Sequence, residues 1–127
     1  MNTANATPDA AGIAHRYIAL WNETDAVRRQ QMLEAGWTVD ACYVDPVMQA
    51  RGHEEINGLV GAVHQRFPGF SFALAGKADA HGDRLRFSWT LGPGDAADLI
   101  QGTDFAQVEA GKLRSVTGFL DKIPVGA

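Results

Sequence analysis

Residues 85–91, which read Leu-Arg-Phe-Ser-Trp-Thr-Leu, alternate without a break between large apolar and polar side chains. Successive side chains of a strand point to opposite faces of a sheet, so this period of two predicts a β-strand with one buried and one exposed face. Half-buried strands of this kind are typical of antiparallel sheets. The outward face is expected to be polar, with Arg84, Arg86, Ser88 and Thr90.

The same period continues on both sides of this strand. The expected strands are residues 70–74, 85–91, 99–108 and 113–120. His81-Gly82-Asp83 is expected to be the tight turn between the first two, and residues 109–112 the hairpin turn between the last two. These segments predict a four-stranded antiparallel meander.

Before residue 68 the apolar residues recur at helical spacing instead. The expected helices are residues 9–22, 24–35 and 53–67, with short strands at 42–44 and 48–51. Thr24 is a good N-cap for the second helix, and its basic pair Arg28-Arg29 is expected to face solvent. Helices followed by antiparallel strands predict the α+β class. We expect a cone-shaped α+β barrel, with three N-terminal helices packed on a curved, mostly antiparallel sheet.

Length and composition describe an ordinary globular chain of 127 residues, with 46% apolar and 20% charged residues. We expect a flexible N-terminal tail at residues 1–8 and a single domain over residues 9–127. The formal charge of −4 offers no basic surface for phosphates, so no nucleic-acid partner is expected. No apolar segment is long enough to span a membrane and no secretory signal is evident, so we expect no membrane partner and a cytoplasmic location.

The sequence offers no pattern for a metal or a cofactor, and none is expected. The single cysteine, Cys42, excludes a disulfide within the chain and a zinc site built from several cysteines. No pair of histidines has convincing metal-ligand spacing. Gly92-Pro93-Gly94 lacks the following helix with Lys and Ser or Thr that a phosphate-binding loop requires.

Three polar side chains are candidates for an apolar space between the helices and the sheet. Tyr17 lies in the apolar stripe of the first helix, and Asp45 ends a short strand before Pro46. Strand parity places Asp104 on one face with Val108. A carboxylate at the mouth of an apolar cavity can act as a general base. A carboxyl group buried deeper has a raised pKa, and together with a tyrosine hydroxyl it can stabilise an enolate oxygen.

Each of these residues also has a purely structural reading. Tyr17 is equally consistent with a core tyrosine, and Asp45 with a turn residue. Asp104 could instead pair with Arg86 or Thr117 across the sheet. The facing of the last strand also stays open, so that either Thr117 and Phe119 or the residues next to them point inward.

Large apolar residues are expected around the same space, where they either fill the cone or line a ligand cavity. The candidate ligand-binding residues are Trp21, Val60, His64, Phe67, Phe72, Phe87 and Trp89. His64 is included because it lies at the edge of the apolar stripe of the third helix.

The order of several short motifs resembles the nuclear transport factor 2-like superfamily. The motifs are Tyr43-Val44-Asp45-Pro46, Gly52-His53-Glu54-Glu55-Ile56, Phe67-Pro68, and Gly102-Thr103-Asp104 with Gly111-Lys112-Leu113 in the last strands. The resemblance covers residues 10–121. Within the superfamily, the sequence is similar to the SnoaL-like and ketosteroid-isomerase-like branches.

The ketosteroid-isomerase-like branch places a tyrosine in an Arg-Tyr step and a base in an Asp-Pro-Val step, and Arg16-Tyr17 and Asp45-Pro46-Val47 match them. Its second acid lies early in the third long strand, where Asp104 fits and Thr103 stands in a gapless alignment. The resemblance implies a small hydrophobic carbonyl compound that is isomerised or cyclised by proton transfer. Asp45 would be the base, and Tyr17 with protonated Asp104 would hold the enolate oxygen.

The resemblance is also compatible with other functions. The protein could bind a small hydrophobic molecule without chemistry, or act as a dimeric interaction domain. Sheet faces often pair in this superfamily, so a homodimer through the sheet is expected. The Asp-Arg-Asp set of its epoxide hydrolases and the paired histidines of its dehydratases find only partial matches, at Arg86 and His64.

Overall fold

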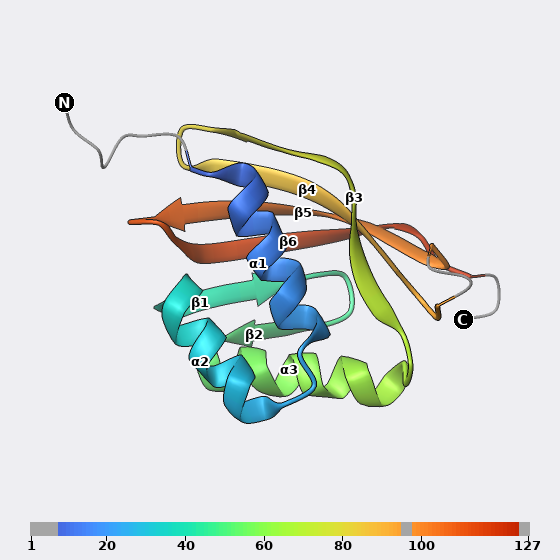
Figure 1. Cartoon of the computed structure of the whole chain (residues 1–127). Coiled ribbons are helices and arrows are strands. Elements are labelled where there is room, and N and C mark those ends of the chain that lie inside the picture. Colours follow the sequence, from blue (N-terminus) through green and yellow to red (C-terminus); the bar gives the residue numbers. More distant parts are fainter. Residues whose placement is uncertain (1–7, 95–97, 125–127) are drawn as a thin grey trace.

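Three helices lie against one face of a curved six-stranded sheet in the computed structural model, which describes residues 8–94 and 98–124 (Figure 1). The elements are α1 (Ala10–Asn22), α2 (Ala26–Gly36), β1 (Trp37–Val44), β2 (Gln49–Arg51), α3 (Gly52–Arg66), β3 (Ser71–His81), β4 (Arg84–Gly92), β5 (Ile100–Glu109) and β6 (Lys112–Lys122). The predicted α+β class and the packing of N-terminal helices on a mostly antiparallel sheet are confirmed. Residues 1–7, most of the predicted tail, lie outside the described residues.

The first two helices begin at aspartate caps. The Asp9 carboxylate accepts a hydrogen bond from the Gly12 amide at 3.1 Å and so caps α1. The cap of α2 is Asp25, which accepts from the Val27 amide at 3.0 Å, and not the expected Thr24. Both residue types cap well, so the sequence alone did not distinguish these neighbours. None of the helices described is long and apolar enough to cross a membrane.

The strand order is β2-β1-β6-β5-β4-β3, so the last strand of the meander pairs with the first strand of the chain. Neighbours from β3 to β6 are antiparallel, whereas β6 and β1 are parallel. β1 begins at Trp37, well before its predicted start at Cys42, and Trp37 pairs with Leu113. Because β2 and β3 form the two edges, the curved sheet does not close on itself.

A β-bulge determines which side chains of β6 face inward. Arg114 is an extra residue between two paired positions of this strand. Beyond it, Val116 and Gly118 are buried, whereas Thr117 and Phe119 are exposed. One extra residue reverses the facing of all that follow, and for this reason the alternation in the sequence left the question open.

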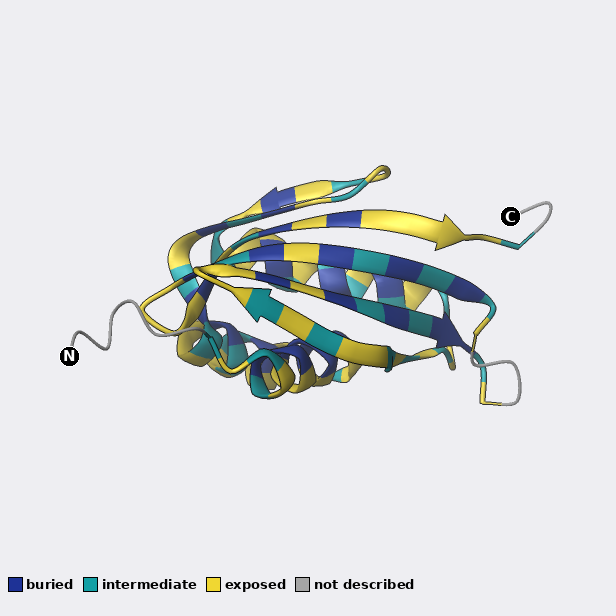
Figure 2. Cartoon of the chain, turned by 90° about the horizontal axis from the view of Figure 1, so that it is seen from above, coloured by how far each residue is buried: buried dark blue, intermediate teal, exposed yellow. Residues whose placement is uncertain are grey.

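The core lies between the helices and the concave face of the sheet, and buried and exposed residues alternate along the strands (Figure 2). Its centre is aromatic. The Tyr17 ring packs edge-on against Phe87 at 4.8 Å and stacks near Trp37 at 5.9 Å between centroids. Trp21, one helical turn further along α1, lies 5.5 Å from Phe72. The apolar stripe of α1 thus anchors this helix across β1, β3 and β4.

Arg29 corrects the expectation of a solvated basic pair, because its side chain is buried whereas Arg28 is exposed. Its Nε donates to the Asn57 side-chain oxygen of α3 at 2.7 Å, and its guanidinium donates to the Glu23 carbonyl at 2.8 Å. The buried guanidinium therefore joins α2 to α3 and to the end of α1. This role depends on tertiary partners that sequence periodicity does not reveal.

We expect Arg29→Ala to lower the free energy of unfolding by roughly 2 kcal/mol, because it removes a buried side chain and leaves two part-buried acceptors without a donor. Arg28→Ala is the matched control. It removes an exposed ion pair with Glu23 at 3.2 Å and should cost less than about 1 kcal/mol. Urea unfolding followed by tryptophan fluorescence measures both, and equal losses would contradict the structural role of Arg29.

Candidate functional site

A cavity of about 410 Å³ lies between α1, α3 and the concave face of the sheet. Its wall is mostly apolar and aromatic, with Trp21, Val63, Phe67, Phe70, Phe72, Trp89, Leu91 and Ile100 among the lining residues. Three charged residues also line it, namely Asp45, Arg66 and Asp104. A concave apolar space with a few convergent polar groups is the usual form of a small-molecule site.

At one wall of the cavity, α1 and β5 bring two of the candidate residues together. The Tyr17 hydroxyl donates a hydrogen bond to Asp104 Oδ2 at 2.5 Å. Tyr17 is 3% and Asp104 1% exposed, so the pair is almost completely removed from water. The other carboxyl oxygen, Asp104 Oδ1, has no hydrogen bond of good geometry among the described residues, although the Trp89 indole is close enough to lower the pKa of this carboxyl group. A buried polar atom of this kind is costly and is therefore a position where a ligand group could bond.

Burial is the main influence on the ionisation of this pair. It raises the pKa of Asp104 to about 6, and the hydrogen bond from Tyr17 opposes part of that rise. Burial and the nearby Asp104 charge raise the pKa of Tyr17 well above its ordinary value of 10.0. Tyr17 therefore remains a hydroxyl donor near neutral pH, whereas Asp104 exchanges a proton in the mildly acidic range.

The facing of Asp104 is fixed by its neighbour in β5. Thr103 points the other way, where its hydroxyl donates to Asp121 Oδ2 at 2.6 Å. The alternative partner Arg86 lies on that outer face too and pairs with Asp79 at 3.6 Å. Asp104, and not Thr103, therefore faces the cavity.

Asp45 lines the same cavity at the end of β1, and four hydrogen bonds hold it there. Its Oδ1 accepts from the amides of Val47 at 2.8 Å and Met48 at 2.9 Å, so it does organise the turn around Pro46. Its Oδ2 accepts from the Tyr43 hydroxyl at 2.6 Å, and its own amide donates to the Met48 carbonyl. Asp45 therefore both stabilises the turn and lines the cavity, so its two interpretations are compatible.

Tyr43 is a cavity residue that sequence reasoning missed. It lies two positions before Asp45, so strand parity already places both side chains on one face of β1. Burial is the largest cause of a raised pKa at Tyr43, which keeps its hydroxyl protonated as a donor to Asp45. Arg66, which lies 5.8 Å from the centre of the Phe67 ring, is a second lining residue that was not predicted.

Gly118 of β6 lies between the two aspartates, where there is no room for a side chain. A Cβ atom at this position would lie 2.8 Å from Asp104 Oδ1, 3.3 Å from Asp45 Cβ and 3.5 Å from the Tyr43 hydroxyl oxygen. A side chain at this position would therefore collide with Asp104 Oδ1. Glycine leaves this oxygen uncovered beside Asp45 and Tyr43.

The structure brings some of the predicted ligand-binding residues to the cavity but not others. Trp21, Phe67, Phe72 and Trp89 line it. Val60, His64 and Phe87 do not. Val60 is completely buried in the core, the Phe87 ring is covered by Tyr17, and His64 Nε2 donates to the Trp21 carbonyl at 2.5 Å. Within residues 8–94 and 98–124, no three His, Cys, Asp or Glu side chains form a group that could hold a metal ion.

The outer face of the sheet is less polar than expected from β4 alone. Phe105 and Phe119 form an edge-to-face pair there with centroids 5.7 Å apart, and they are 46% and 52% exposed. Both residues come from strands whose facing the sequence did not settle. Pairing of two copies through this face stays a prediction.

The sequence and the structure of this chain also match those of known proteins. The model of the SnoaL-like domain matches residues 14–116. Among solved structures, a putative isomerase of the SnoaL-like family from Agrobacterium tumefaciens is 42% identical, with a TM-score of 0.84 and matches covering 88% of this chain and 97% of that chain. No curated protein matches the sequence.

More distant structures share the fold alone. A putative ketosteroid isomerase from Kribbella flavida has 21% identity and a TM-score of 0.66, covering 91% of this chain and 80% of that one. A putative SnoaL-like polyketide cyclase from Jannaschia has 11% identity and a TM-score of 0.66, with 90% and 88% covered.

The raised pKa of Asp104 predicts a pH-dependent difference between the wild type and Asp104→Asn. The folded-state value of about 6 lies above the ordinary 3.8, so protonation of Asp104 favours the folded state. This contribution is complete well below pH 3.8 and is lost as the pH rises through 6. The amide does not titrate, so the stability of Asp104→Asn relative to wild type should increase by roughly 2 kcal/mol between pH 4 and 7.

Urea unfolding at pH 4, 5.5 and 7.5 measures this difference. Asp40→Asn, an exposed position on β1, is the control and should follow the pH dependence of the wild type. If Asp104→Asn also runs parallel to wild type over this range, the carboxyl group does not titrate as described.

Proposed function

The chain belongs to the SnoaL-like domain family, and we propose that it catalyses proton transfer on a small apolar carbonyl compound bound in the cavity of about 410 Å³. The observation that carries the proposal is that Asp45 and the buried Tyr17–Asp104 pair line the same cavity, with Gly118 between them. Asp45 there can accept a proton, and the Tyr17–Asp104 pair, with Asp104 protonated on Oδ1, can donate a hydrogen bond to an oxygen.

In the proposed reaction, Asp45 is the general base. Its carboxylate removes a proton from the carbon next to the substrate carbonyl, and the electron pair of that C–H bond moves to form an enolate. Asp45 then returns the proton to a different carbon of the conjugated system. Atoms and electrons balance without a co-reactant, so the net result is an isomerisation.

The hydrogen bonds of Asp45 support this assignment. A carboxylate has about four lone-pair positions. The amides of Val47 and Met48 use two of them, and Tyr43 uses a third, on Oδ2. One position on Oδ2 stays available for a proton. The three donors also hold the carboxylate in one orientation, which favours catalysis because no reorganisation is needed.

We assign the stabilisation of the enolate oxygen to the Tyr17–Asp104 pair. Hydrogen-bond donors in an apolar, water-poor site stabilise developing negative charge far better than they do in water. Tyr17 retains its proton because burial raises its pKa, and it donates that proton to Asp104 Oδ2. Asp104 in its neutral form then donates from its other oxygen, Oδ1, to the enolate oxygen. The free Oδ1 of Asp104 supports direct contact between this carboxyl group and a ligand.

A binding module without chemistry is the second candidate. Asp45 Oδ1 accepts hydrogen bonds from the amides of Val47 and Met48 and so stabilises the turn. This structural role alone explains an aspartate at position 45, and it therefore favours the second candidate. This candidate predicts a ligand that enters the same cavity and leaves unaltered.

We expect the protein to convert a bicyclic β,γ-unsaturated ketone into its conjugated isomer, which is measured as a rise in enone absorbance. Asp45→Asn should lower the rate by at least about 100-fold, because it removes the base. Asp104→Asn retains a donor and should keep most of the activity, whereas Asp104→Ala should not. For wild type, kcat/KM should fall as the pH rises above about 6, where Asp104 ionises, and Asp104→Asn should lose this fall.

Binding of 2-naphthol, a planar mimic of the enol, separates the two candidates. It is followed through quenching of the cavity tryptophans Trp21 and Trp89. Saturable binding without ketone turnover would support the binding module and contradict the catalytic proposal. Turnover by Asp45→Asn at the wild-type rate would contradict the role of Asp45 even if the ketone is isomerised.

A further inference from the structure

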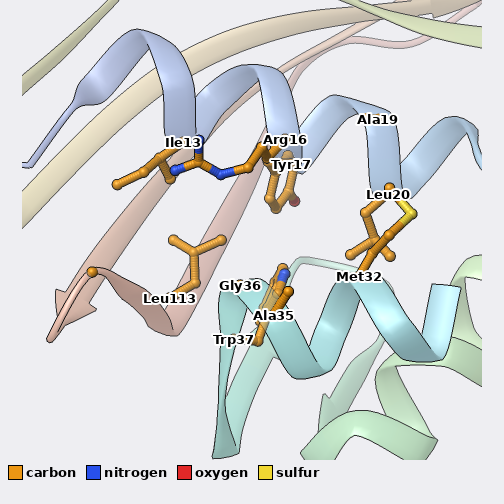
Figure 3. Close-up of a pocket in the computed structure, with 11 residues that line it drawn as sticks. Ile13, Arg16, Tyr17, Ala19, Leu20, Met32, Ala35, Gly36, Trp37 and Leu113 are labelled. Carbon is orange, nitrogen blue, oxygen red and sulfur yellow. The ribbon is translucent and has the colours of Figure 1, made fainter.

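A second cavity, of about 180 Å³, lies where α1 passes over the end of α2 and the first residues of β1 and β6. Figure 3 shows Ile13, Arg16 and Tyr17 of α1 facing Leu113 of β6, with Trp37 at the base. We call it the rear cavity. Tyr17 lines both the rear cavity and the larger one, so its ring separates the two.

The wall of the rear cavity is apolar apart from one cation. Ile13, Leu20, Met32 and Leu113 supply its aliphatic surface. Arg16 is the one charged side chain that lines it, and it takes part in none of the four ion pairs between described residues. The site therefore combines an apolar chamber with a cation that has no carboxylate within ion-pair distance in the described part of the chain.

One acidic group close to Arg16 is the helix cap Asp9. Both side chains approach the same point above Gly12, where a Cβ would meet the Asp9 carboxylate and lie 3.3 Å from an Arg16 guanidinium nitrogen. Asp9 is occupied in capping the Gly12 amide and does not form an ion pair with Arg16. Its negative charge nevertheless lies on the same side of the cavity and opposes the entry of an anion.

The size and chemistry of the rear cavity select a small class of ligands. An apolar protein cavity of about 150 Å³ is enough to hold a benzene ring, and the rear cavity has about 180 Å³. An arginine recognises a carboxylate through two parallel hydrogen bonds. We propose that the rear cavity is a second binding site, separate from the catalytic one, for a one-ring aromatic carboxylate. The ring lies between Ile13, Leu20 and Leu113, and the carboxylate bonds to Arg16.

Benzoate is the probe, and the three tryptophans report where it binds. Trp37 lines the rear cavity, whereas Trp21 and Trp89 line the larger one. In protein labelled with 5-fluorotryptophan, each resonance is assigned by replacing one tryptophan with phenylalanine. Benzoate should shift the Trp37 resonance in a saturable manner and leave that of Trp89 unchanged. Benzamide, which has the same shape without the charge, should bind at least tenfold more weakly.

Variants test the two halves of the site separately. Arg16→Gln should weaken benzoate binding at least tenfold and remove the preference over benzamide. Asp9→Asn, which preserves the cap, should strengthen benzoate binding. Ala35→Leu should fill the cavity and abolish binding of both probes. Arg16 and Ala35 are exposed, so these changes are compatible with folding, and Arg28→Gln, an exposed arginine that does not line the cavity, is the control.

Two results would overturn the proposal. One is a benzoate-dependent shift of Trp89 without a shift of Trp37, which places the probe in the larger cavity. The other is equal affinity of wild type and Arg16→Gln for benzoate. Because the readout is binding at Trp37, either result leaves the proposed proton-transfer activity to its own test.

Discussion

The buried hydrogen bond between Tyr17 and Asp104 determines how α1 sits on the sheet. A carboxyl group that is 1% exposed is unfavourable unless it has a partner, and Tyr17 is the partner that the structure supplies. With this bond in place, α1 can rotate little about its axis. Its rotation in turn places Trp21, one turn further on, against Phe72 and at the cavity wall. A single polar contact in an apolar core thus specifies the position of the helix, whereas the surrounding aromatic rings supply most of the burial.

The fold could be predicted where the local pattern and the tertiary structure agree. The strict alternation of residues 85–91 and the helical stripes before residue 68 gave the class, the helices and the meander correctly. The errors arose where distant residues decide the outcome. Arg29 is buried because Asn57 and the Glu23 carbonyl accept from it, and β1 starts at Trp37 because Leu113 pairs with it. Neither partner is near in sequence.

The candidate site was predictable to a similar degree. Tyr17, Asp45 and Asp104 could be named because a polar residue within an apolar stripe or beside a proline is visible in the sequence, and the structure places all three around one cavity. Tyr43 was missed although it lies two positions before Asp45 and therefore shares its face of the strand. Gly118 was also missed. Its contribution is the absence of a side chain, which gains meaning only when the bulge at Arg114 has placed it opposite Asp104.

Because β1 pairs with β6, the sheet cannot be completed during synthesis until β6 has been made. Residues 37–44 are made before their partner on one side, which lies far along the chain at residues 113–117. Until that segment leaves the ribosome, β1 has only the three-residue strand β2 beside it, and the apolar face of α1 has no complete sheet to cover. Contacts so distant in sequence form slowly. The apolar faces of the helices that precede β1 therefore stay exposed to aggregation until β6, the last of the described strands, has been made.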